Sequence, residues 1–123
     1  MSWDEYLEDL DDATIASGIV STEGALCGYR GDWKASPQEA LSWAKLFLDL
    51  ALCRQRGLSY GGSKLFVTDY SDKLIVARRD NFIVQLVKSQ VLFIVCVCDK
   101  KKPPKPALEI CHELIADLSQ SGY

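Results

Sequence analysis

Residues 65–97, LFVTDYSDKLIVARRDNFIVQLVKSQVLFIVCV, decide the fold. Runs rich in β-branched and other apolar residues alternate here with short segments of turn composition, so the runs read as strands. Connections this short can join only antiparallel neighbours, and the stretch therefore predicts a β-meander. The strands are expected at residues 65–69, 74–78, 82–87 and 91–97. The last strands are apolar at nearly every position, which indicates cover on both faces of the sheet.

Amphipathic helices are predicted before and after this meander. Ser36-Pro37-Gln38-Glu39 places a capping serine before a proline at the first helical position and a glutamate at the third, which is typical of a helix start. That helix is expected to end at Gly57, and a final helix is expected after a lysine-rich loop. The predicted apolar stripes are Leu41, Ala44, Leu48 and Leu52 in the first helix, and Ile110, Cys111, Leu114, Ile115 and Leu118 in the last.

The N-terminal segment adds another helix and two strands. Ser2 and Glu5 have the spacing of a capping box, and residues 13–21 and 25–31 read as short strands. The apolar stripe of this first helix is Trp3, Tyr6, Leu7 and Leu10. We expect an α+β fold in which a central antiparallel meander has helices on both faces and the N- and C-terminal helices pack side by side, with residues 1–123 forming one domain.

Composition narrows the class of protein. The chain carries a net charge of −3, with six acids and no bases among its first twelve residues, and its pI near 5.1 argues against a nucleic-acid partner. The N-terminus has no basic segment followed by an apolar one, so we expect no secretion signal. The five cysteines include no C-x-x-C pair, which favours reduced thiols and a cytoplasmic location.

Residues that could support catalysis or bind a metal are few. The single histidine, His112, follows Cys111, but adjacent helical residues do not face each other. Gly61-Gly62-Ser63-Lys64 lacks the spacing of a phosphate-binding loop. Cys96 and Cys98 share a strand face, but with His112 they match no zinc motif. The sequence therefore predicts no catalytic residue, no metal site, no cofactor and no enzymatic activity.

The aromatic residues allow two interpretations. Trp3 and Tyr6 can belong to the core, since they share a stripe with two leucines. Alternatively, the two terminal helices pack side by side and leave an aromatic groove. Such a groove suits proline-rich peptides, because flat rings meet proline faces while Trp N–H and Tyr O–H groups donate to carbonyls. Further candidates for this groove are Tyr29, Trp33 and Tyr123.

A set of basic residues also has two interpretations. The basic residues that lie on or beside the meander are Lys64, Lys73, Arg78, Arg79 and Lys88. Such a set is usually a solvated face. The alternative is a patch that steers an acidic partner into contact.

Several segments together resemble profilins. The opening Met1-Ser2-Trp3-x-x-Tyr6, the ending Leu118-x-x-x-x-Tyr123 and the central Gly57-Leu58-x-x-Gly61-Gly62-x-Lys64 are similar to the corresponding parts of that family. Chain length and element order also match, so the resemblance spans essentially the whole chain. It implies a protein that binds monomeric actin, regulates actin polymerisation at the cytoskeleton, and links actin to proline-rich partners such as formins. It also implies phosphoinositide head groups as a partner and a monomeric state.

The resemblance assigns roles to individual positions. Tyr29 or Trp33 would replace a tryptophan that the family often has where this chain has Cys27, and Asp117 stands where some relatives have histidine or tyrosine. Asp69 and Glu109 are acidic where many relatives are basic, which suggests weaker actin binding or an actin with compensating charges. The predicted poly-proline-binding residues are therefore Trp3, Tyr6, Leu118 and Tyr123 by position, with Tyr29 and Trp33 as the possible replacements. The predicted actin-binding residues are Lys64, Arg78 and Glu113 by position, and the basic set adds Lys73 and Lys88.

Two other classes of protein have a similar small size and a similar arrangement of helices and strands. A roadblock- or longin-type scaffold also has a sheet flanked by helices, and it would dimerise and dock small GTPases. A small sensory or enzymatic domain would carry a ligand pocket, but the chain lacks a convergent set of catalytic side chains. The aromatic residues at both ends favour the profilin interpretation.

Overall fold

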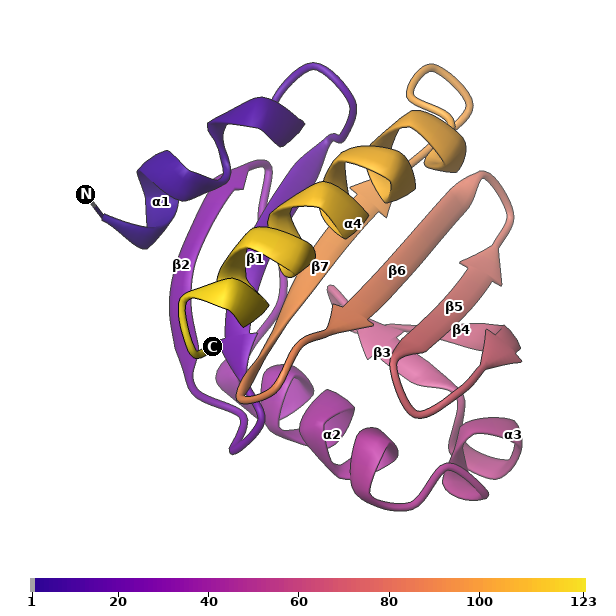
Figure 1. Cartoon of the computed structure of the whole chain (residues 1–123). Coiled ribbons are helices and arrows are strands. Elements are labelled where there is room, and N and C mark those ends of the chain that lie inside the picture. The colour runs from indigo at the N-terminus through magenta and orange to yellow at the C-terminus, as the bar shows by residue number, and fades with distance from the viewer. Residues whose placement is uncertain (1) are drawn as a thin grey trace.

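The computed structural model of the protein describes residues 2–123 and contains one seven-stranded antiparallel sheet with helices on both faces (Figure 1). The strand order is β2-β1-β7-β6-β5-β4-β3. Met1, the first residue of the profilin-like opening motif, lies outside the described residues. The elements are α1 (Trp3–Tyr6), the 3-10 helix η1 (Glu8–Leu10), β1 (Ala16–Ser21), β2 (Leu26–Gly31), α2 (Pro37–Leu48), α3 (Leu52–Arg56), β3 (Leu58–Tyr60), β4 (Ser63–Tyr70), β5 (Leu74–Arg79), β6 (Phe82–Lys88), β7 (Leu92–Cys98) and α4 (Pro104–Gln120).

The predicted meander is confirmed. Strands β4 to β7 pair consecutively and antiparallel, and their bounds differ from the predicted ones by at most two residues at an end. Every residue of β7 is buried, as expected for a strand with cover on both faces. β7 lies in the middle of the sheet because β1 pairs with its other edge.

Each face of the sheet has its own hydrophobic core. The α2-side core joins α2 to the sheet and contains Trp43 and Phe93. The α4-side core joins α1, η1 and α4 to the opposite face and contains Leu10, Ile94 and Cys111. Figure 1 shows α4 crossing the sheet with α1 beside it, while α2 and α3 lie away from them. The expected two-sided cover and the pairing of the terminal helices are both present.

The helix after Ser36 begins as predicted but differs in its length and buried face. The reciprocal capping box of Ser36 and Glu39 is present, and Pro37 is the first helical residue. The single helix expected up to Gly57 is wrong, because α2 ends at Leu48 and α3 begins at Leu52. The predicted stripe is wrong at Leu41 and Leu48, which are 44% and 82% exposed, whereas Ala44 is buried and Leu52 packs against the core as predicted. The residues that α2 places in or against the core are Ala40, Trp43, Ala44, Leu46 and Phe47.

The first helix is shorter than expected. An α-helical turn ends at Tyr6, and η1 carries the chain on to Leu10. The Ser2 hydroxyl accepts a hydrogen bond from the Glu5 N–H at 3.2 Å, as its capping position predicts. None of the helices in residues 2–123 combines the length and the apolar character required to span a membrane.

The hydroxyl group of Ser17, on β1, is buried in the sheet without a hydrogen-bond partner among the described residues. Ser17→Ala removes this unpaired group, so we expect the free energy of unfolding to stay level or to rise by up to about 1 kcal/mol. Chemical denaturation followed by circular dichroism measures the change.

The neighbouring Thr14 is the matched control for Ser17. Its buried hydroxyl donates to the Leu10 carbonyl at 2.8 Å, so Thr14→Val removes a bond that is made. We expect Thr14→Val to destabilise the fold by about 1 kcal/mol. A loss of similar size in Ser17→Ala would show that the Ser17 hydroxyl does have a partner.

Candidate binding surfaces

The two ends of the chain meet in a terminal aromatic cluster formed by Trp3, Tyr6 and Tyr123. The Trp3 ring lies edge-on to Tyr123, with centroids 5.2 Å apart and planes at 88°, and edge-on to Tyr6 at 6.3 Å and 74°. Trp3 and Tyr6 are half-buried against the α4-side core, and Tyr123 is 42% exposed. Trp3 and Tyr6 therefore fit both interpretations, because each ring packs against the core and keeps part of its surface accessible.

Backbone contacts bring the N-terminal part of this cluster onto the sheet. Gly28 lies under α1, and a Cβ atom at that position would stand only 2.9 Å from the Cβ of Trp3. A larger residue would therefore push α1 away from β2. The Asp4 carboxylate accepts a hydrogen bond from the Tyr29 N–H at 3.1 Å and holds the two elements together.

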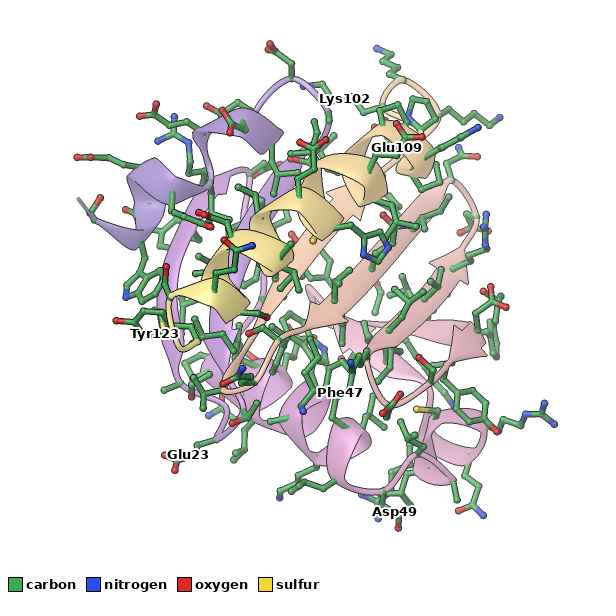
Figure 2. All side chains as sticks on the ribbon, viewed as in Figure 1. Glu23, Phe47, Asp49, Lys102, Glu109 and Tyr123 are labelled. Atoms are coloured by element: carbon green, nitrogen blue, oxygen red, sulfur yellow. The ribbon has the colours of Figure 1, made fainter. Side chains whose placement is uncertain are left out.

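The C-terminal part is fixed by the hairpin between β6 and β7. The Tyr123 carbonyl accepts hydrogen bonds from the Val91 N–H at 2.8 Å and from the Ser89 hydroxyl at 2.7 Å. The Tyr123 N–H donates to the Leu118 carbonyl at 2.9 Å. Figure 2 shows Tyr123 just beyond the end of α4, on the side of β2. These three bonds give the last aromatic ring a defined position.

The Tyr6 hydroxyl connects α1 to α4. It lies 3.0 Å from the Leu114 carbonyl and 2.8 Å from Oδ2 of Asp117, and both are hydrogen-bond acceptors. Burial, the bond to Asp117, and the negative charges of Asp117 and Asp9 raise the pKa of Tyr6 well above its ordinary value. Tyr6 therefore remains a neutral hydrogen-bond donor throughout the physiological range.

Two residues predicted for the poly-proline groove lie elsewhere, and a third, Leu118, is buried beneath it. Trp33 packs on the α2-side core, with its ring 6.0 Å from Trp43 and over Gly18, and Tyr29 stacks on Trp33 at 6.2 Å. Because Trp3 and Tyr6 pack on the opposite core, the prediction that Tyr29 or Trp33 joins them is wrong. Leu118 is 3% exposed, so it supports the cluster from beneath and offers almost no surface.

A second candidate surface is the part of the α4-side sheet face that α4 leaves open. Leu65 and Val67 point into the α2-side core, so Lys64 and Phe66 alternate onto the other face. Phe66 and Arg78 are direct cross-strand partners on β4 and β5, and all three side chains are exposed. In Figure 1 the helix α4 passes over β7 and β6 and leaves β4 and β5 uncovered.

Phe66 is a residue that the sequence interpretation missed. It is 67% exposed, which is unusual for a phenylalanine in a strand. The sequence does indicate its exposure, because Leu65, Phe66 and Val67 are consecutive apolar residues on a strand and cannot all face the same core. We call Lys64, Phe66 and Arg78 the open strand face.

The other predicted actin-binding residues do not join this group. Lys73 and Lys88 lie at the opposite end of the strands from Arg78, where the Lys88 N–H donates to the Lys73 carbonyl at 2.8 Å. Glu113 is exposed on α4. The structure thus brings Lys64 together with Arg78 and Lys73 together with Lys88, and it places Glu113 on α4.

The cysteines are free thiols with structural positions. Cys96 and Cys98 lie in the α4-side core with Cys111, whereas His112 is exposed on the outside of α4. Burial and the nearby charges of Cys96 and Asp99 raise the pKa of Cys98 to about 12. Its thiol is therefore protonated and unreactive at neutral pH.

The sequence model of the profilin family matches residues 1–123. Profilin-3 of Dictyostelium discoideum is 27% identical to this chain over 129 aligned residues, which cover 100% of both chains. The crystal structure of Acanthamoeba castellanii profilin II superposes with a TM-score of 0.89 at 21% identity, covering 99% of this chain and 100% of that one. The fold is therefore that of profilins.

Two further structures were solved with partners. Mouse profilin IIa, in complex with a double repeat from the FH1 domain of mDia1, has a TM-score of 0.77 at 15% identity and covers 100% of both chains. LokiProfilin2, in complex with rabbit actin, has a TM-score of 0.74 at 16% identity, covering 95% of this chain and 92% of that one. These similarities concern the fold, since the identities are low.

Proposed function

The chain belongs to the profilin family, and on that premise we propose that it binds proline-rich peptides and monomeric actin on separate surfaces and so regulates actin polymerisation. The observation that carries the proposal is the terminal aromatic cluster. It presents partly exposed rings and polar ring groups at one site, as recognition of a polyproline II helix requires. The relative solved with an FH1 repeat has the same fold, which supports formin-type partners.

Intrinsic tryptophan fluorescence tests the proline-binding function. Trp3 is part of the cluster, whereas Trp43 is fully buried and Trp33 lies on the opposite core. We expect titration with polyproline to give a saturable signal change and a glycine-serine peptide to give none. A flat response to polyproline, confirmed by calorimetry, would refute this part of the function.

The open strand face is the proposed actin-binding surface. It combines an exposed apolar ring, Phe66, with the cations Lys64 and Arg78, which suits a partner that is acidic around an apolar centre. The exposed Asp69 on β4 and Glu109 on α4 reduce the positive charge of this region. We therefore expect an actin that compensates these two acids to bind more tightly than one that does not.

Reversing the two cations of this face should slow association with actin. We expect Lys64→Glu combined with Arg78→Glu to lower the association rate by about tenfold at low salt, because attraction becomes repulsion. The difference should shrink as added salt screens the charges. Stopped-flow measurements with labelled monomeric actin at several salt concentrations test this.

Lys34→Glu with Lys45→Glu is the matched control for that double reversal. It changes the net charge equally at two exposed positions that do not belong to the open strand face, one after β2 and one on α2. Its rate should stay close to that of the unmodified protein. Equal slowing in both double variants would mean that net charge matters and that Lys64 and Arg78 are not in the interface.

The remaining parts of the proposal follow from these partners. An actin-binding protein of this kind works in the cytoplasm at the cytoskeleton, as a monomer without a cofactor. Phosphoinositide head groups are a further partner class, and Lys64 and Arg78 are the residues that would attract them. The whole-chain profilin match favours this assignment over a roadblock- or longin-type scaffold. A stable homodimer in light scattering would count against the monomeric state.

A further inference from the structure

The hydrogen-bonding capacity of Tyr6 limits what the terminal aromatic cluster can offer a ligand. A tyrosine hydroxyl carries one proton, and here two acceptors, the Leu114 carbonyl and the Asp117 carboxylate, already lie within 3.0 Å of it. A peptide carbonyl arriving at Tyr6 would compete with both of them. The polar groups that remain beside the rings are therefore the Trp3 indole N–H, which donates, and the Asp117 carboxylate, which can only accept hydrogen bonds.

The surroundings of this carboxylate are acidic. The charges of Asp117 and Asp9 both act on the Tyr6 hydroxyl, and both residues are exposed, Asp117 on α4 and Asp9 on η1. Within residues 2–123 neither carboxylate takes part in an ion pair, whereas the nearby Arg30 is occupied by Asp11 at 2.6 Å. The cluster thus combines aromatic rings with uncompensated negative charge.

Proline residues provide no hydrogen-bond donor for the Asp117 carboxylate. A proline residue has no backbone N–H, so an all-proline segment offers the carboxylate no donor. An arginine within the segment supplies both the missing donors and the missing charge, and guanidinium–carboxylate pairs are among the stronger hydrogen bonds in proteins. Resting on the proposed function, we propose that the cluster selects proline-rich segments that contain a basic residue, and that Asp117 is the residue that recognises the cation.

A comparison of arginine-containing with citrulline-containing peptides distinguishes the contribution of charge to binding from that of side-chain shape. The probes are proline decamers with one residue replaced by arginine or by citrulline, which has nearly the same shape but no charge. The replacement is placed in turn at three consecutive central positions, because a polyproline II helix has three residues per turn and one of these faces Asp117. An unmodified proline decamer completes the set, and affinities are measured by calorimetry and tryptophan fluorescence.

We expect the arginine peptide to bind about five- to tenfold more tightly than its citrulline counterpart in the best register, and the ratio to fall as salt rises. Asp117→Asn should bring that ratio below about twofold while the unmodified decamer still binds, since the asparagine carbonyl can still accept from Tyr6. Asp49→Asn is the matched control, because it removes one charge at the far side of the molecule (Figure 2) and should keep the full ratio.

Two results would overturn the inference, and each differs from failure of the proposed function. Equal affinities for arginine and citrulline peptides in all three registers would show that the cluster does not recognise the cation. An arginine preference that persists in Asp117→Asn would remove Asp117 from that role. Failure of the unmodified decamer and of every modified peptide to bind would instead contradict the proline-binding function itself.

Discussion

Replacing Trp3 with alanine is expected to weaken binding of a proline decamer by about thirtyfold or more, since an aromatic anchor at the centre of an interface is worth about 2–4 kcal/mol. Trp3 contacts both other rings of the cluster, so its loss removes one proline-facing ring and leaves Tyr6 and Tyr123 without their common neighbour. Calorimetric titration with the decamer measures the effect. Actin binding should change little, because the open strand face lies on β4 and β5.

Tyr29→Ala is the matched control for Trp3→Ala. Tyr29 is also an exposed aromatic residue and lies on β2, but its ring stacks on Trp33 over the α2-side core. Its removal should leave proline binding within about twofold. Equal weakening in both variants, or joint loss of actin and proline binding in Trp3→Ala, would point to general unfolding and would remove the cluster from the binding site.

Glu39→Gln is expected to cause a large loss of stability, about 2–4 kcal/mol at neutral pH. The Glu39 side chain is 9% exposed and accepts four hydrogen bonds. The donors are the N–H groups of Ser36 at 2.9 Å and of Gly61 and Gly62 at 3.1 Å each, and the Ser59 hydroxyl at 2.6 Å. Glutamine replaces one of the two acceptor oxygens with an NH₂ group, which would face donors. Urea denaturation followed by circular dichroism measures the loss.

The pH dependence of stability provides a second test at Glu39. Burial works to raise the pKa of this carboxyl, but the hydrogen bonds from Ser59, Ser36, Gly62 and Gly61 outweigh it and hold the pKa below the ordinary value. A lowered pKa in the folded state means that this stabilisation is present above the unfolded-state pKa and disappears as the pH falls through the folded-state pKa.

Acidification should therefore destabilise the unmodified protein more steeply than Glu39→Gln. The exposed Glu23 provides the control, and Glu23→Gln should follow the unmodified protein at every pH. Parallel pH curves for Glu39→Gln and the unmodified protein would show that Glu39 does not contribute in its charged form.

The features that the sequence predicted correctly are those fixed by local chemistry. The start of α2 follows from Ser36, Pro37 and Glu39, whose capping interactions need nothing beyond four consecutive residues. The meander follows from apolar runs separated by turns too short for any other pairing. The contact between Trp3 and Tyr123 is not local, and it was expected from the resemblance to profilins.

The end of α2 and its buried face depended on packing that local patterns do not contain. No glycine or proline lies between Leu48 and Leu52, yet Asp49 adopts an extended conformation and the helix stops. The break lets Leu50 and Leu52 pack against the α2-side core while Leu48 points outward. Trp43, which the predicted stripe omitted, decides the face because it fills the core and donates to the Ser59 carbonyl at 2.8 Å.

The error at Tyr29 has a specific cause. The register of β1 and β2 shifts between Ile19 and Val20, so that Gly28 pairs with Ile19 while Leu26 pairs with Val20. The extra residue, Cys27, changes which face each side chain of β2 takes. Gly28 then lies beneath Trp3, and Tyr29 turns to the opposite core. Gly28 stands at the bulge and glycine within a strand is a signal for one, but alternation alone could not place Tyr29.

The contact between Trp3 and Tyr123 also determines at which stage of folding the terminal aromatic cluster can form. These residues are separated by nearly the whole chain, and contacts of such high sequence separation have a large loop-closure cost and form slowly. The proposed proline-binding cluster can form only when α4 has docked on the sheet beside α1 and brought Tyr123 to Trp3. Local unfolding of α4 would therefore remove the proposed proline-binding site even if the strands of the sheet stayed paired.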